Sequence, residues 1–260
     1  MSTPGHEAPY DPFAWFYDRY WNRRFHSRAW PIVQRLLLAR LPGGAAILDV
    51  GCGTGHLAAK LAAGGFRVTG IDTSGGMLAR ARRSAPEAEL HRADARHFRP
   101  AGRFDAALAT FDTLNHIVEP AGLASAARHI AKALVPGGLF LFDMLTEEAF
   151  EEHWQGDFSI VEPDHVLVVS AQNFDARDML AHCRITMFRL REGAWQRADT
   201  VVTERCYARR EIAAALDAAG FTATACYDAR DLGMQGDLGA GRVFYLAEKP
   251  AGTTRPRNSG

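Results

Sequence analysis

Residues 45–57 constrain the fold of this chain more than any other stretch. Residues 45–50 form an apolar run that predicts a buried strand, and a helix with one apolar face follows. Three glycines at alternate positions lie between the two: Gly51, Gly53 and Gly55. Glycine suits a tight turn at which a ligand meets bare backbone, and the free N–H groups at a helix start are donors for a polar ligand. The stretch therefore predicts a strand, a ligand-binding turn and a helix.

Two acidic residues flank this turn. Asp49 lies two residues before the first glycine, and Asp72 follows a second predicted strand over residues 67–71. An acidic residue about 20 positions after such a turn is suited to a ribose diol. The glycine spacing is Gly-x-Gly-x-Gly, whereas a classical dinucleotide site has Gly-x-Gly-x-x-Gly. The acidic residues therefore favour a ribose-bearing cofactor, and the spacing counts against a dinucleotide.

This pattern resembles motif I of the class I S-adenosylmethionine (SAM) dependent methyltransferases, whose usual form is (Asp/Glu)-x-Gly-x-Gly-x-Gly. The resemblance runs from about Tyr17 to Lys249, and its specific motifs lie between Ile47 and Asp143. It is similar above all to the bacterial small-molecule members, of the sugar N-methyltransferase kind. The resemblance implies an α/β fold, with a doubly wound, Rossmann-like sheet of seven strands and an antiparallel β insertion that covers the substrate site.

The sequence pattern divides the chain into four parts. Residues 10–149 are expected to form the SAM-binding core with an N-terminal helical lid. Residues 150–205 lack helix–strand alternation, and turn signals separate their apolar runs, which predicts an antiparallel insertion of three or four strands. Residues 206–249 are expected to complete the core with its last helix and strands. The tail over residues 250–260 is expected to be disordered, as are residues 1–9.

Local signals predict where several elements begin and end. Pro31 suits the first turn of a second N-terminal helix that runs to about Arg40. The sequence from Thr73 to Gly76 caps another helix, and Gly220 closes the helix predicted over residues 209–219. The remaining strands are predicted at residues 88–92, 104–110, 139–142, 221–226 and 242–248.

The N-terminal segment is rich in aromatic residues: Tyr10, Phe13, Trp15, Phe16, Tyr17, Tyr20, Trp21, Phe25 and Trp30. One interpretation is a helix that packs on the core, because aromatic side chains bury a large area. The other is a lid, because aromatic faces attract cations and the sulfonium of SAM is a cation. Tyr17-Asp18 resembles the Tyr-Asp pair at the start of many small-molecule methyltransferases. The resemblance also suggests that Arg23 faces the methionine carboxylate, with Arg24 and Arg28 as alternatives.

Residues 111–117 are the second informative stretch, because they follow a predicted central strand and ligands of open α/β sheets lie outside the carboxyl ends of the strands. His116 is the leading candidate base, since an unperturbed histidine titrates near neutral pH. It also resembles a histidine after the fourth strand of sugar N-methyltransferases. The alternative is a structural histidine that bonds to backbone. Tyr17 is the second candidate base, or else only part of the lid, and Asp112 and Asn115 are candidates to orient the substrate.

The resemblance implies a cofactor site built from several elements. Asp94 matches an aspartate that contacts the adenine amino group in the family, and a polar loop residue is the alternative interpretation. The cofactor contacts implied in this way are Tyr17, Arg23, Asp49, Gly51, Gly53, Gly55, Asp72, Thr73, Met77, Asp94, Ala95, Phe111 and Asp112.

Charge and cysteine usage argue against several classes of function. Lys plus Arg (30) balances Asp plus Glu (30), and no Asn-Pro-Pro-Tyr type sequence follows the fourth strand, which disfavours a nucleic-acid partner. The four cysteines form no CxxC pair, so neither a metal site nor a disulfide framework is predicted, and the thiols are expected to be reduced.

No apolar stretch approaches the roughly 20 residues of a membrane span, and residues 1–9 lack an apolar signal core. The expected compartment is the cytoplasm, without membrane contact, and the expected state is a monomer or homodimer.

The sequence thus predicts an enzyme that transfers a methyl group from SAM to a nitrogen or oxygen of a small-molecule acceptor. One alternative is a catalytically inactive SAM-binding protein that acts as a sensor or partner subunit. Another is a dinucleotide-dependent dehydrogenase, which the glycine spacing opposes.

Overall fold

The computed structural model describes residues 8–251, apart from the side chains of Arg23, His153, Asn173 and Ala223. The disorder expected for residues 1–7 and 252–260 therefore concerns residues outside the described part. For residues 8 and 9 the expectation is wrong, because both are tied to the folded chain. The backbone N–H of Ala8 donates to Asp11 at 2.9 Å, and the Thr200 hydroxyl donates to the carbonyl of Pro9 at 2.7 Å.

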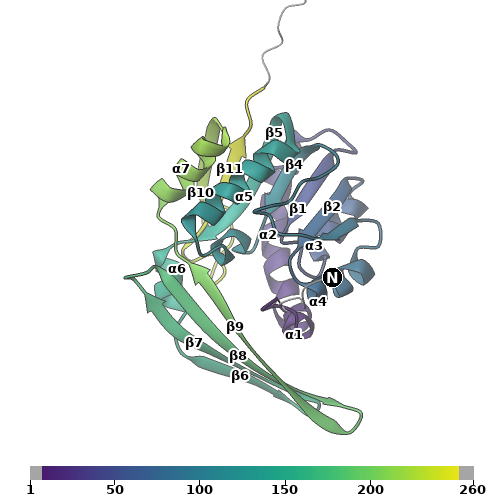
Figure 1. Cartoon of the computed structure of the whole chain (residues 1–260), viewed down its shortest axis with the longest axis vertical. Helices are drawn as coiled ribbons and strands as arrows, with labels where there is room; N and C mark the ends of the chain where they lie inside the picture. Colours follow the sequence, from purple (N-terminus) through teal and green to yellow (C-terminus); the bar gives the residue numbers. More distant parts are fainter. Residues whose placement is uncertain (1–7, 252–260) are drawn as a thin grey trace, which may run out of the picture.

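A seven-stranded sheet forms the centre of the fold (Figure 1). Its strands are β1 (Ala46–Val50), β2 (Arg67–Asp72), β3 (Glu89–Arg92), β4 (Phe104–Ala109), β5 (Leu134–Leu145), β10 (Ala223–Asp228) and β11 (Arg242–Glu248). The order across the sheet is β10-β11-β5-β4-β1-β2-β3. Strands β1 to β5 pair in parallel, and β11 runs antiparallel to both β5 and β10. The central strand β1 lies between β2 and β4, so the carboxyl ends of these three strands meet at one edge.

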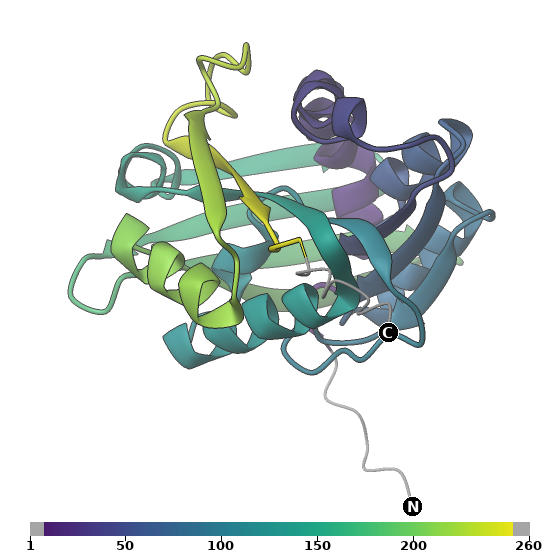
Figure 2. The same cartoon turned by 90° about the horizontal axis from the view of Figure 1, so that it is seen from above.

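Helices cover both faces of this sheet, as the doubly wound pattern predicts (Figure 2). The helices α5 (Pro120–Ala133) and α7 (Arg209–Ala219) bury Leu123, Ile130, Ile212 and Leu216 on one face. The helices α2 (Asn22–Leu36) and α3 (His56–Ala63) bury Phe25, Ile32, Leu57 and Leu61 on the other. The remaining helices are α1 (Ala14–Tyr20), α4 (Gly75–Ser84), α6 (Glu147–His153), η1 (Leu38–Arg40) and η2 (Thr113–His116).

Helix α2 corrects the prediction that a helix begins at Pro31, because Pro31 lies inside it. The proline leaves the carbonyl of Ser27 without its helical donor. Both residues are exposed, so water can satisfy that carbonyl at little cost. The buried residues Phe25, Ile32 and Val33 meanwhile continue one apolar face across the proline. Burial against the sheet therefore outweighs the local helix-breaking signal.

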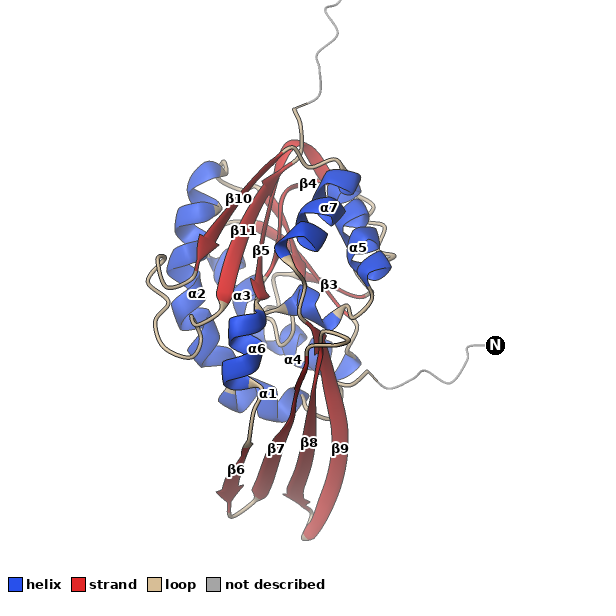
Figure 3. Cartoon of the chain, turned by 90° about the vertical axis from the view of Figure 1, so that its left-hand side faces the viewer, coloured by secondary structure: helices blue, strands red, loops and turns tan. Residues whose placement is uncertain are grey.

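A separate four-stranded antiparallel sheet projects from the core (Figure 3). Its strands, in order across the sheet, are β6 (Asp157–Glu162), β7 (His165–Asp175), β8 (Leu180–Arg191) and β9 (Ala194–Arg205). Its inner face packs on the N-terminal aromatic residues Phe13 and Phe16 through Leu167, Ile185 and Met187. Phe13 and Phe16 therefore pack on the projecting sheet, whereas Phe25 of the same aromatic segment packs on the central sheet. Within residues 8–251, no helix combines the length and apolar character that crossing a bilayer requires.

Candidate active site

The three glycines of the turn between β1 and α3 all have positive φ, with values of +68° at Gly51, +53° at Gly53 and +83° at Gly55. Their surroundings differ. A β-carbon on Gly51 would overlap the side chain of Thr113, and one on Gly55 would lie 2.9 Å from the Cα of Ala81. A β-carbon on Gly53 would meet nothing closer than the Tyr17 ring at 3.8 Å. Gly51 and Gly55 therefore serve close packing, whereas Gly53 faces the open space that a ligand can enter.

Asp72 ties the end of β2 to this turn. One carboxylate oxygen accepts the backbone N–H of Gly53 at 2.9 Å, and the other accepts that of Ser74 at 2.8 Å. Burial raises the pKa of Asp72 above its ordinary value, while these two N–H groups act in the opposite direction. Each carboxylate oxygen retains a second acceptor position. The carboxylate can therefore hold the turn and still accept a ligand hydroxyl.

Asp49 lies fully inside the same edge of the sheet, with 2% of its surface exposed. Burial, and then the neighbouring Asp72, raise the pKa of Asp49 to about 7. Within the described chain its Oδ2 atom has no hydrogen-bond partner. Buried polar atoms in native proteins are nearly always paired. An unpaired carboxylate oxygen beside the open turn is consistent with a ligand that supplies a donor there.

The chain after β4 has an unusual backbone. Phe111 and Asp112 are consecutive non-glycine residues with positive φ, at +64° and +52°. Such conformations cost about 1–3 kcal/mol each and persist where the surroundings enforce them. Here the buried carboxylate of Asp143 accepts both backbone N–H groups, from Phe111 at 2.7 Å and from Asp112 at 3.1 Å. Arg242 forms ion pairs with Asp143 and with Asp112, the latter at 2.8 Å.

This strained turn presents His116 at the end of η2. The Nδ1 atom of His116 lies 3.1 Å from the carbonyl oxygen of Asp112, which an N–H at that position satisfies. The Nε2 atom then keeps its lone pair, and it lies 2.7 Å from the Tyr10 hydroxyl, which can donate to it. Oε1 of Glu204 lies 3.6 Å from the same nitrogen. Both interpretations of His116 therefore fit the geometry, because one nitrogen bonds backbone and the other is available as a base.

Tyr10 and Glu204 are site residues that the sequence did not single out for this role. Tyr10 belongs to the aromatic segment, but nothing in the local sequence pairs it with His116. Glu204 lies on β9, and its partner across the strand pair is Ala181, so only the register of the projecting sheet brings it to the core. Burial, and then the Asp112 carboxylate, raise the pKa of Glu204 well above its ordinary value. Single ligand atoms of Asp112, His116 and Glu204 lie within 4.8 Å of one another.

The N-terminal segment closes over this edge of the sheet. The Tyr17 ring lies above Gly53 and 6.0 Å from the ring of Phe111, between centroids. The carboxylate of Asp11 accepts the backbone N–H of Gly76 at 2.8 Å and the hydroxyl of Ser74 at 2.6 Å, which fastens the segment to the start of α4. This arrangement is consistent with the predicted lid.

The other predicted residues lie in varied surroundings. Asp94 forms a bidentate ion pair with Arg96, and the shortest distance, from Nη2 of Arg96 to Oδ2 of Asp94, is 2.6 Å. This pairing is typical of a polar loop residue. Asn115 is buried, and its side chain bonds to backbone, through the carbonyl of Arg205 at 2.8 Å and both backbone groups of Leu145, which ties η2 to β5 and β9.

Four of the remaining predicted cofactor contacts lie around this edge of the fold, namely exposed Thr73, buried Met77, half-buried Ala95, and Phe111, which stacks on Phe25 at 4.1 Å between centroids. Arg23 lies in α2, and its side chain is outside the described part. Its alternative Arg24 is exposed and forms an ion pair with Asp237 at 2.6 Å.

The chain resembles known proteins in sequence and in fold. Residues 47–138 match the model of the methyltransferase domain family. A Geobacillus sp. (strain WCH70) protein named as a methyltransferase is 36% identical over 140 residues, which are 52% of this chain and 57% of that protein. The dTDP-3-amino-3,6-dideoxy-alpha-D-glucopyranose N,N-dimethyltransferase of Streptomyces fradiae is 37% identical over 102 residues, or 39% of this chain and 40% of that protein. The chain thus spans about half the length of these relatives.

A solved structure is similar along nearly the whole chain. It is the SAM-bound CalS10, an amino pentose methyltransferase from Micromonospora echinaspora, at 25% identity and a TM-score of 0.69. The superposition covers 96% of this chain and all of that one (100%). The seven-stranded sheet with an additional antiparallel sheet is therefore an arrangement that this chain shares with a SAM-binding protein.

Proposed function

We propose that this chain, whose residues 47–138 match the model of the methyltransferase domain family, transfers a methyl group from SAM to a nitrogen or oxygen of a small molecule. The resemblance to the class I SAM-dependent methyltransferases, the fold class and SAM as the cofactor are confirmed by this family match and by the similarity to the SAM-bound neighbour. The acceptor and the roles of individual residues are the part that we propose.

The residues at the edge of the sheet fit SAM. Gly53 leaves open space above the turn, Asp72 has free acceptor positions for hydroxyls, and the unpaired oxygen of Asp49 can accept from a donor of the ligand. The Tyr17 ring lies beside Gly53, where an aromatic face can stabilise a cation. When bound, SAM supplies a methyl group made electrophilic by the sulfonium.

The observation that carries the proposal is the position of His116 next to the glycine turn. A β-carbon on Gly51 would overlap Thr113, which begins the short helix η2 that ends with His116, so the turn and this helix are in direct contact. The bond from Nδ1 to the carbonyl of Asp112 orients the ring and leaves Nε2 to take a proton from the acceptor. The carboxyl group of Glu204, 3.6 Å from Nε2, can stabilise the imidazolium that results.

The charge of the site favours an amine as the acceptor. The buried carboxyl groups of Asp112 and Asp143 form ion pairs with the one buried guanidinium, that of Arg242, and a third buried carboxyl group, that of Glu204, lies beside His116. An ammonium in this place would compensate the surplus of acidic groups, as a neutral hydroxyl would not. The relatives named above as acting on amino sugars agree with this preference. Amino sugars are therefore the first acceptors to test, and hydroxyl compounds are the second.

The decisive experiment is conversion of SAM to S-adenosylhomocysteine with a panel of amines, hydroxyl compounds and thiols, with mass spectrometry of the products. A methylated amine that forms with the wild type and not with Gly53→Val would support the proposal. Tight binding of S-adenosylhomocysteine with no methylated product across the panel would favour the inactive sensor. Tighter binding of NAD than of SAM would favour the dehydrogenase.

Three expectations stay predictions. They are a cytoplasmic location, a monomer or homodimer, and the absence of a nucleic-acid partner. Size-exclusion chromatography with light scattering tests the oligomeric state, and a gel-shift assay with duplex and single-stranded probes tests the last.

A further inference from the structure

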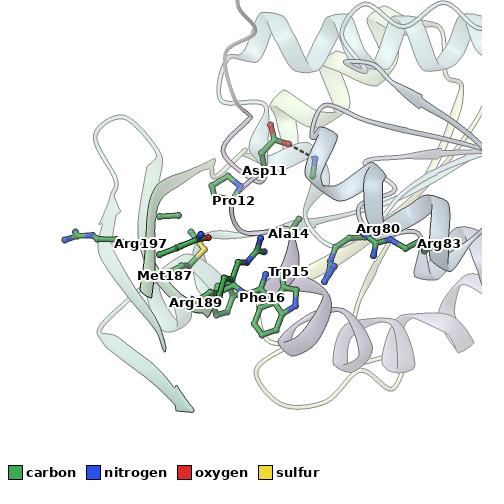
Figure 4. Close-up of a pocket in the computed structure, with 14 residues that line it drawn as sticks. Asp11, Pro12, Ala14, Trp15, Phe16, Arg80, Arg83, Met187, Arg189 and Arg197 are labelled. Carbon is green, nitrogen blue, oxygen red and sulfur yellow. Dashed lines mark hydrogen bonds between the residues drawn. The ribbon is translucent and has the colours of Figure 1, made fainter. Parts of the chain in front are cut away.

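A cleft lies apart from the glycine turn, between α1, α4 and the far end of the β8–β9 hairpin (Figure 4). Its volume is about 340 Å³. The N-terminal segment separates it from the proposed catalytic site, because Tyr10 contacts His116 whereas the next residue, Asp11, lines the cleft. Arginines from two distant parts of the sequence line it: Arg80, Arg83, Arg189, Arg191 and Arg197.

Strand alternation separates these arginines into two groups. Arg189 and Arg191 stand at alternate positions of β8 and so share the face that lines the cleft with Met187. Arg197 pairs across the strands with Phe188, which belongs to the opposite face, and its guanidinium lies 5.7 Å from the centre of that ring. Figure 4 shows Arg197 directed away from the other labelled arginines. Arg197 also forms an ion pair with Asp199 at 2.7 Å.

The arginines that face the cleft have little compensating negative charge. The only acidic residue among those that line it is Asp11, and its carboxylate already accepts hydrogen bonds from Ala8, Ser74 and Gly76. Asp18 lies 3.5 Å from Arg80. Within residues 8–251, no ion pair involves Arg83, Arg189 or Arg191.

Arg189 is held in a fixed position without losing its donors. Its guanidinium stacks on Trp15 at 3.9 Å from the ring centre, and stacking leaves the N–H groups at the rim of the guanidinium plane free to bind. Burial, and then repulsion from Arg191 and Arg80, lower the pKa of Arg189, while Asp164 acts in the opposite direction. A bound anion would relieve this repulsion. The whole chain has no net charge, so the positive charge of the cleft is a local concentration.

We propose that this cleft is a binding site for a small molecule that carries a phosphate or diphosphate group. A guanidinium group can donate two parallel, bidentate hydrogen bonds to the oxygens of a phosphate group. Arginine is therefore the preferred residue for binding phosphate groups. The volume of the cleft lies in the range of about 300–1,000 Å³ that is usual for small-molecule sites. The anion site does not depend on the methyl-transfer function, and it exists whether or not the phosphate belongs to the methyl acceptor.

Calorimetric titration with inorganic pyrophosphate tests the site directly. The wild type is expected to bind, and the double variant Arg189→Gln/Arg191→Gln is expected to bind at least about tenfold more weakly, which corresponds to about 1.4 kcal/mol. Arg197→Gln is the matched control, because this arginine is on the same hairpin and faces away. Its affinity for pyrophosphate should equal that of the wild type.

A second variant tests the same site in case the double variant does not fold. Arg83→Gln changes an exposed residue on a different element, α4, and is also expected to weaken pyrophosphate binding. All variants should bind S-adenosylhomocysteine as the wild type does, since the glycine turn is untouched. Absence of pyrophosphate binding by the wild type would overturn the proposal. So would equal affinity in the double variant, or an equal loss in Arg197→Gln.

The source of the phosphate is resolved by kinetics once an acceptor is known. Pyrophosphate that competes with the acceptor in methyl transfer, and loses this effect in the double variant, identifies the anion as part of the acceptor. Binding with the same arginine dependence but without competition identifies a separate phosphate-bearing ligand. The calorimetric test needs no methyl transfer, so failure of the proposed activity and failure of the anion site are distinguishable.

Discussion

Replacement of Gly53 by valine separates the ligand-binding role of the glycine turn from its packing role. Gly53 has φ of +53°, and a non-glycine residue in this region costs about 1–3 kcal/mol. A β-carbon there would meet only the Tyr17 ring at 3.8 Å and the Gly51 carbonyl at 4.0 Å, so it adds no overlap with the protein. We expect Gly53→Val to lose about 1–3 kcal/mol of unfolding free energy and to remain folded.

We expect Gly53→Val to weaken cofactor binding far more than it lowers the stability of the fold. The valine side chain fills the open space above the turn, so binding of S-adenosylhomocysteine should fall below detection by calorimetry. Gly51→Ala is the comparison, because its φ is +68° and its β-carbon would overlap Thr113. Overpacking adds about 1–3 kcal/mol to the backbone strain. Gly51→Ala should therefore unfold at a lower urea concentration than Gly53→Val, although it introduces the smaller side chain.

Circular dichroism during urea unfolding measures the stability of both variants, and calorimetry measures ligand binding. Wild-type affinity for S-adenosylhomocysteine in Gly53→Val would refute the assignment of Gly53 to the cofactor site. A Gly53→Val protein that is less stable than Gly51→Ala would refute the distinction between open and packed glycines.

Three further predictions follow from the buried groups of the site. Asp143→Ala should lower the free energy of unfolding by about 3–5 kcal/mol in urea titrations, because it removes one of the two carboxylates paired with the buried Arg242 and leaves the backbone N–H groups of Phe111 and Asp112 without their acceptor, and a loss under about 1 kcal/mol would contradict this. His116→Ala should lower kcat by about 10²–10⁴-fold with S-adenosylhomocysteine affinity unchanged, and a collapse of that affinity would move His116 to the cofactor site. The raised pKa of Asp49, about 7, lies above the ordinary value of about 3.9 in an unfolded chain, so the folded protein holds this proton longer. In the ligand-free protein Asp49 should therefore contribute a loss of stability as pH rises from about 4 to 7, and Asp49→Asn should make the decline over this range smaller, whereas identical pH profiles would show that Asp49 is ionised in the fold.

Local sequence signals predicted the elements that depend on neighbouring residues. The three glycines mark the turn after β1, and all three adopt positive φ. Ser74 caps α4 by accepting the backbone N–H of Met77 at 3.0 Å, and Gly220 ends α7 with φ of +88°. These outcomes follow from backbone sterics and unpaired N–H groups within a few residues.

Element ends that depend on burial were predicted less well. The fifth strand was expected over residues 139–142, but β5 runs from Leu134 to Leu145. The Pro-Gly-Gly sequence inside β5 is irregular: Leu134 pairs with Phe104 and Leu139 with Ala106, so residues 135–138 have no partner in β4, and Gly137 has φ of +77°. Pairing with neighbouring strands thus extended β5 beyond its local signal, as sheet packing extended α2 through Pro31.

The sequence by itself determined the class of fold, the glycine turn, the acidic residues beside it and the placement of His116 at the end of a central strand. Each of these features depends on residues that lie close together in the sequence. The tertiary structure alone decided that Tyr10 and Glu204 meet His116, because Tyr10 and His116 are 106 positions apart in the sequence and the register of β9 places Glu204. It also joined Arg80 to Arg189 in one cleft. Pairings of this kind arise from strand register and packing between distant segments, which no local pattern records.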